Sequence, residues 1–208
     1  MKKLLVLTLL FLGAVAAEAQ SVRASFGVKG VGLGIQPNTE IAPIGGMQIG
    51  GGGGAFFGLK FFNTIGIQAE ALYTLSNATY ETNLFGKQTW LSTQEYIMVP
   101  VVMQLWLGRA FALEAGYQQA IAWSSNLKCI MSTNNNQVGY DTYDSGILDY
   151  GSLVAGITLN MGKNVYLNCR YTTALEYSYV MFDKPSQNTG FQIGLGIRFF
   201  NSKKSVFE

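Results

Sequence analysis

Apolar and polar residues alternate with a period of two along much of this chain. In the segment 65–76 every second residue is apolar: Ile65, Ile67, Ala69, Ala71, Tyr73 and Leu75. This period is typical of a β-strand with one apolar and one polar face. The same alternation predicts eight strands, near residues 22–34, 47–61, 65–80, 96–107, 111–123, 148–161, 165–179 and 190–200.

The connections between these segments alternate between long and short. Tight turns are expected at 63–64, 108–109 and 162–164, and long polar connections at 36–43, 81–93, 124–146 and around 183–186. Short periplasmic turns and long extracellular loops are typical of outer-membrane barrels, whose strands are apolar outside and polar inside. We therefore predict an all-β fold: an eight-stranded antiparallel up-and-down transmembrane β-barrel with both ends on the periplasmic side. Pro100 cannot donate to a ladder and predicts a bulge or local break in its strand.

The N-terminus has the pattern of a secretory signal. Lys2 and Lys3 precede an apolar run over 4–16, and Ala17-Glu18-Ala19 offers a small-residue cleavage site. The run is too short for a spanning helix. We expect residues 1–19 to be a cleaved signal peptide, 20–200 the barrel and 201–208 a short periplasmic tail. The expected location is the outer membrane.

Composition agrees with a membrane barrel more than with a soluble β-sandwich. Only 12% of the residues are charged, 13% are aromatic, and 25 are glycines. The formal net charge is only +2. Nothing in it suggests a nucleic-acid-binding surface, which requires a basic patch. Cys129 falls in a predicted loop and Cys169 on the outward phase of a predicted strand. We favour two free thiols, and a disulfide stays an open alternative because bridge geometry is strict.

The sequence predicts no catalytic, cofactor or metal site. The chain has no histidine, which removes Ser-His-Asp and Cys-His catalysis and the commonest nitrogen ligand of zinc. The glycine runs 30–34 and 50–54 lack the helix and Lys-Ser/Thr that complete phosphate-binding loops, so they are interpreted as aids to curvature or close packing. Asp141, Asp144 and Asp149 offer oxygen ligands for Ca²⁺, but their spacing favours a solvated loop.

Charged residues on the inward phase are the main candidates for a functional role. These residues are Lys29, Glu70, Glu114, Arg170 and Arg198. Buried charges need partners, so we expect an interior ion network that closes the lumen. The alternative is a proton or ion path. Side chains just fill the interior of an eight-stranded barrel. This favours the ion network that closes the lumen over a proton or ion path.

Four segments resemble strand motifs of a known family: 67–74 (IQAEALYT), 96–103 (YIMVPVVM), 111–117 (FALEAGY) and 191–199 (FQIGLGIRF). The chain resembles the small outer-membrane β-barrels of Bacteroidetes, the PorT-like or outer membrane protein β-barrel domain family. It departs from the family pattern at Met98, where an acidic residue is usual, and in the residues 201–208 that follow Phe199-Phe200. The resemblance implies a location more than an activity.

The leading functional interpretation is a non-enzymatic integral outer-membrane barrel with a structural, surface-interaction or envelope-assembly role. A narrow channel for ions or very small solutes is the second, and a soluble ligand-binding barrel the third. Expected partners are outer-membrane lipid, the barrel-assembly machinery during insertion, and an envelope protein that contacts the loops 81–93 and 124–146. No nucleic-acid partner is expected.

Overall fold

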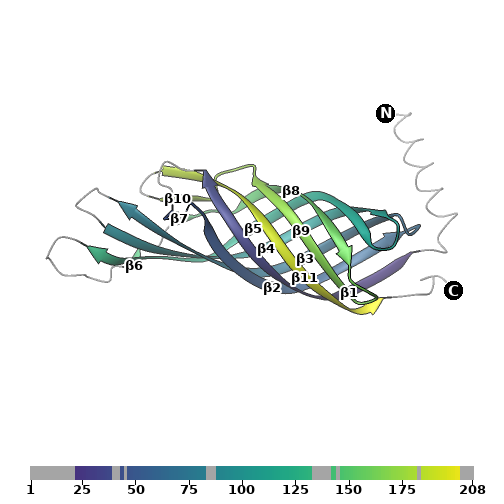
Figure 1. Cartoon of the computed structure of the whole chain (residues 1–208). Coiled ribbons are helices and arrows are strands. Elements are labelled where there is room, and N and C mark those ends of the chain that lie inside the picture. Colours follow the sequence, from purple (N-terminus) through teal and green to yellow (C-terminus); the bar gives the residue numbers. More distant parts are fainter. Residues whose placement is uncertain are drawn as a thin grey trace, which may run out of the picture.

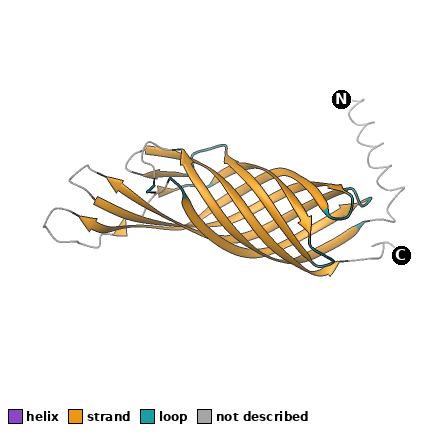
Figure 2. Ribbon diagram, in the orientation of Figure 1, coloured by secondary structure: helices purple, strands orange, loops and turns teal. Residues whose placement is uncertain are grey.

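Eight long antiparallel strands form a closed, tilted ring (Figure 2). The computed structural model describes residues 22–38, 43–44, 46–82, 88–132, 142–143, 146–181 and 184–201. The long strands are β1 (Arg23–Asn38), β2 (Gln48–Phe61), β3 (Ile65–Thr82), β4 (Gln88–Leu107), β5 (Phe111–Ser132), β8 (Tyr150–Asn160), β9 (Val165–Ala174) and β11 (Lys184–Asn201). The short strands are β6 (Thr142–Tyr143), β7 (Gly146–Ile147) and β10 (Tyr179–Met181).

Each long strand pairs with the next long strand along the chain, and β11 returns to pair with β1. The closing ladder is antiparallel and runs from Ser25–Asn201 to Asn38–Gln187. Closure removes the open edges that a flat sheet would expose. The eight-stranded up-and-down barrel predicted from the sequence is confirmed. Among the described residues, no helix has the length and apolarity needed to cross a membrane.

The outer face of the barrel is apolar and the inner face is largely polar. On β3, Ile65, Ile67 and Tyr73 are exposed, whereas Gln68 and Glu70 between them are buried. On β11, large apolar side chains are likewise exposed at every second position from Phe191 to Phe199. An apolar outer face suits contact with lipid, and the predicted phase of the alternation is confirmed.

Three short turns lie at one end of the barrel, which we call the turn end. They join β2 to β3, β4 to β5 and β8 to β9, and β1 begins and β11 ends there (Figure 1). Asn63, Gly108 and Gly162 take positive φ angles of 56°, 83° and 115° in these turns. Asparagine and glycine are the residues that adopt this conformation most readily.

The predicted bounds of the long loops were wrong. Most of the predicted loop 81–93 is strand, because β3 continues to Thr82 and β4 begins at Gln88. The predicted loop 124–146 contains the last part of β5, which runs to Ser132, and β6. The predicted strand 165–179 ends at Ala174, and the predicted strand 190–200 begins at Lys184.

Pro100 lies at a gap in the β3–β4 ladder, as the sequence predicted. Pairs form between Ala69 and Val101 and between Leu72 and Met98, and the register gives none between them. The β4–β5 ladder stays in register through Pro100. Proline therefore breaks pairing locally on one side of β4 without a bulge at that point.

Candidate functional site

A buried ion network crosses the lumen of the barrel. Lys29 of β1, Glu70 of β3, Glu114 of β5 and Arg170 of β9 all lie on the inward phase, and each is 2–4% exposed. The Lys29 Nζ atom lies 2.8 Å from Glu70 Oε2. Arg170 donates from Nη2 to Glu70 Oε1 at 2.7 Å and from Nε to Glu114 Oε2 at 2.7 Å. One guanidinium thus joins two carboxylates from different strands.

Neutral side chains complete the hydrogen bonding of both carboxylates. Gln68 Nε2 donates to Glu70 Oε1 at 2.7 Å. Gln104 Nε2 and Thr158 Oγ1 donate to Glu114 Oε1 at 2.8 and 2.6 Å. Burial of a charge is costly unless the group is both paired and hydrogen-bonded. Two cations, two carboxylates and these donors satisfy every carboxylate oxygen of the network and leave it without net charge.

Inward-facing glycines make room for the long side chains of the network. A Cβ atom at Gly194 would overlap the side chains of Asn168 and Lys29. A Cβ atom at Gly156 would overlap the Cys169 carbonyl oxygen and lie 2.9 Å from Arg170 Cγ. From the sequence, only the glycine runs 30–34 and 50–54 were interpreted as aids to curvature or close packing. Gly194 and Gly156 therefore leave space both for the buried cations Lys29 and Arg170 and for neighbouring atoms of β9.

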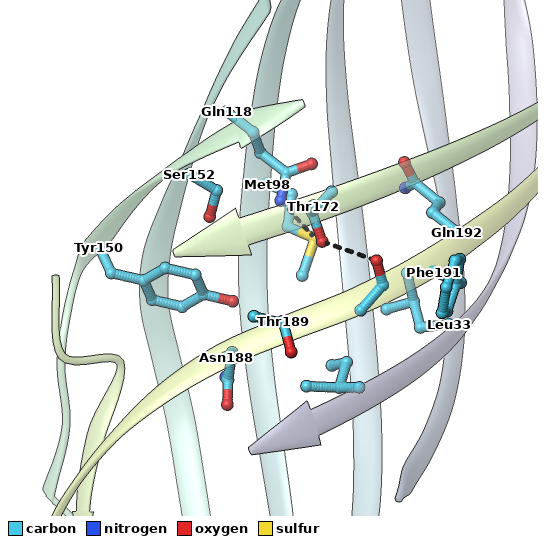
Figure 3. A pocket seen from close by; sticks show the side chains of 12 residues that line it. Leu33, Met98, Gln118, Tyr150, Ser152, Thr172, Asn188, Thr189, Phe191 and Gln192 are labelled. Carbon is cyan, nitrogen blue, oxygen red and sulfur yellow. Dashed lines mark hydrogen bonds between the residues drawn. The ribbon is translucent and has the colours of Figure 1, made fainter. Parts of the chain in front are cut away.

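An apolar cluster lies in the lumen beyond the network, on the side away from the turn end. It forms one cluster of buried side chains: Val31, Leu33, Ile35, Leu72, Tyr96, Met98, Ala120, Tyr150 and Ala174. A cavity of about 20 Å³ lies beside it and is also lined by Gln118 and Gln192 (Figure 3). That volume is room for about one water molecule. A cavity this small agrees with an eight-stranded interior that is filled by side chains.

The chain as a whole matches a family model. The model describes an outer membrane protein beta-barrel domain and matches residues 5–199. The chain belongs to this family. Its location is therefore the outer membrane, and the apolar outer face is the lipid-facing surface.

Solved structures of other barrels show the same fold. This chain is similar to Neisserial surface protein A, with 12% sequence identity and a TM-score of 0.52. The match covers 85% of this chain and 99% of that chain. It is also similar to Ail, the attachment invasion locus protein of Yersinia pestis, solved in complex with the heparin analogue sucrose octasulfate. The identity is 11%, the TM-score 0.50, and the coverage 86% and 99%. No curated protein matches the sequence.

Arg198 was predicted to join the network, and the structure places it elsewhere. Its Nη2 donates to Asn160 Oδ1 at 2.9 Å, and its Cζ lies 4.7 Å from the centre of the Tyr166 ring. On β11 the partner of Arg170 is Gln192, so Arg198 lies six residues closer to the turn end. The polar partners Gln68, Gln104 and Thr158 were missed, although all three share the inward phase that identified the charges.

Several predicted features fall outside the described residues. These include the signal peptide 1–19, the tail from residue 202, Asp141 and Asp144. Asp149 Oδ1 accepts a hydrogen bond from Ala122 N at 2.7 Å. The described part holds no group of three or more His, Cys, Asp or Glu residues suited to a metal ion. Cys169 is a free, exposed thiol, and the Cys129 side chain is not described.

Proposed function

We propose that this barrel is a non-enzymatic surface protein that presents a β-sheet outside the membrane to another protein. The protruding sheet consists of residues 77–82 of β3, 88–95 of β4 and 124–132 of β5. Its tips coincide with the loops 81–93 and 124–146 that the sequence suggested as contact regions. The lumen, in this proposal, has a structural role and conducts nothing.

The unequal length of the strands is the observation that carries this proposal. The last β5–β8 pair is Ala120–Tyr150, whereas β4 and β5 stay paired up to Gln88–Ser132. Strand β5 thus continues 12 residues past its pairing with β8, which is roughly 40 Å along the strand. Strands β3, β4 and β5 run past the ends of their neighbours in Figure 1.

The outward residues of the protruding sheet are too polar for lipid contact. Among the side chains that the structure describes, Tyr73 and Trp123 are the last large exposed apolar residues on β3 and β5 in this direction. Beyond them the exposed residues include Asn77, Glu81 and Asn126. Charged residues are disfavoured on a lipid face. This change of polarity supports a position above the hydrocarbon layer.

The protruding sheet has a small core of its own. Ala78, Tyr80, Trp90 and Leu127 form a buried cluster against which Ile147 of β7 packs. A long unpacked ribbon is only marginally stable in water, whereas this core supports a rigid sheet. A rigid scaffold that carries exposed polar residues is a common arrangement for recognition.

The ion network favours this proposal over a channel. The charged side chains of the ion network are paired with one another at 2.7–2.8 Å and are fully covered. A permeating ion would have to break these pairs. The motifs 67–74 and 96–103 also lead us to infer a relationship to the PorT-like Bacteroidetes barrels, within the wider family.

Site-specific photo-crosslinking in cells tests the proposed function. A photoreactive residue at Thr93 or Asn126 should yield a defined adduct with one partner protein, recovered in mild detergent. The same probe at Arg109, in an exposed turn at the opposite end, is the matched control. If Thr93 and Asn126 give no adduct beyond that of Arg109, the protruding sheet is not a contact surface and the proposal fails.

A further inference from the structure

The charges of the described residues are distributed unequally between the two ends of the barrel. The described cations at the turn end are Arg23, Lys60, Arg109, Lys163 and Arg198. Of the described carboxylates, Glu70 and Glu114 belong to the ion network, and the others lie toward the opposite end: Glu81, Glu95, Asp149 and Glu176. Within the described residues, the turn end therefore has cations and no acidic partner for them.

Three of these cations converge on the opening of the lumen. Arg23 and Lys60 are directly opposite each other in the β1–β2 ladder and lie on the inward phase. Arg198 lies on the inward phase of β11, next in the ring after β1. Both arginines repel the Lys60 ammonium group. Like charges directly opposite each other destabilise a sheet. A bound anion would offset this repulsion, so the arrangement favours anion binding.

Aromatic rings hold two of the cations in place. Lys60 Nζ lies 4.0 Å from the centre of the Trp106 ring. Arg198 lies over Tyr166 and is tied to Asn160, as described above. Cation–π contacts fix the direction of each charge but do not neutralise it. Both cations remain partly exposed, so donors are left available to a ligand.

Trp106 adds an independent indication of a ligand. Its side chain is buried, with 6% exposure, and its Nε1 atom has no hydrogen-bond partner among the described residues. Nε1 lies near Gly66, which is the ladder partner of Lys60. Indole N–H can only donate. Lys60 thus lies beside an indole whose buried N–H donor is unused, and what this donor lacks is a hydrogen-bond acceptor.

We propose that the turn-end opening, formed by Arg23, Lys60, Arg198 and Trp106, binds a phosphate-type oxyanion. Phosphate oxygens accept several hydrogen bonds at once, and the planar guanidinium groups of Arg23 and Arg198 match their geometry. The anion comes either from a soluble phosphate or from the headgroup of an anionic phospholipid in the periplasmic leaflet. This binding is independent of the protruding sheet at the other end.

Protection of Lys60 from acetylation tests the proposal on the wild-type protein. The full folded chain in a non-ionic detergent is treated with an acetylating reagent at constant ionic strength, with inorganic phosphate or chloride. Mass spectrometry follows Lys60 and, as the control, Lys163 in the exposed turn. We expect phosphate to slow acetylation of Lys60 at least fivefold in a saturable way and to leave Lys163 within twofold.

A pair of charge-matched variants tests the same site by affinity. Lys60→Gln/Arg198→Gln should weaken phosphate binding, followed by tryptophan fluorescence, by at least tenfold. Arg109→Gln/Lys163→Gln removes the same amount of charge from the same end of the barrel. This variant should change the phosphate affinity less than twofold. Equal phosphate affinity in both variants, or equal protection of Lys60 and Lys163, overturns the proposal.

Nanodiscs distinguish the two sources of the anion. If phosphatidylglycerol nanodiscs protect Lys60 without added phosphate and phosphatidylcholine nanodiscs do not, the lipid headgroup occupies the opening. If protection needs inorganic phosphate in both bilayers, a soluble anion is the ligand. Absence of selective protection by either source rejects the site.

Discussion

Replacement of Arg170 by methionine should destabilise the barrel strongly. Arg170 makes three charged hydrogen bonds, at 2.7 Å to Glu70 Oε1, 3.0 Å to Glu70 Oε2 and 2.7 Å to Glu114 Oε2. Without it, only Lys29 remains to balance two buried carboxylates. Removal of one partner from a buried ion pair costs about 3–5 kcal/mol. We expect a loss of that size in the free energy of unfolding.

Urea unfolding in lipid vesicles, followed by tryptophan fluorescence, measures this loss. With an m-value of about 2 kcal/mol/M, the midpoint should fall by about 1.5–2.5 M urea. Arg198→Met is the control, since it removes a cation from the same inner face but outside the network. Arg198 contributes one hydrogen bond and a contact with a ring, so about 1 kcal/mol is expected.

Equal midpoints for the two variants would refute the reasoning. That result would mean that the two carboxylates find protons, water or other donors at little cost when Arg170 is absent. The network would then be a consequence of the packed barrel and not a source of its stability.

Four further predictions follow from the same geometry. Lys29→Met combined with Glu70→Gln should destabilise less than the sum of the single changes, and a double-mutant cycle by urea unfolding should give a coupling above about 1 kcal/mol. Gly54→Val, which would drive a Cβ into the backbone of β3, should reduce the folded fraction on a heat-modifiability gel, whereas Ala55→Val on the outer face should not. Cys169→Arg places a charge on the lipid face and should cost about 2–4 kcal/mol in vesicle unfolding, and Cys169→Leu should be close to neutral. Wild-type protein in a planar bilayer should show no channel steps, and reproducible steps would contradict a closed lumen.

The ring of strands was readable from the sequence because lipid imposes a strong contrast on every second residue. The difference in polarity between neighbouring residues weakens where strands leave the membrane. Between residues 81 and 93 both faces carry polar side chains, as at Thr89 and Ser92, so a strand and a loop have the same composition there. Whether these residues form strands depends on pairing within the protruding sheet. The alternation along one segment does not report that pairing.

The depth of a charged residue could be predicted only where a tight turn provides a reference. Glu70, Glu114 and Arg170 each follow a short turn by about six residues, which places them at one level. No tight turn connects β11 to β1. The depth of Arg198 in the barrel therefore depends on the register of the β1–β11 ladder, which the sequence does not provide. The amide and hydroxyl partners of the network carry no charge, and nothing in the pattern distinguished them from other inward polar residues.

The ladder between β1 and β11 also constrains how the protein can fold. It joins the first described strand to the last, so Gly30 and Leu195 become neighbours although 165 residues separate them in sequence. Contacts of such high sequence separation form slowly, because a long loop must close before any of them is gained. Until β11 arrives, β1 and β9 each present an unpaired edge able to recruit another chain. The interval between synthesis of β1 and arrival of β11 is therefore the period in which this chain is most exposed to aggregation.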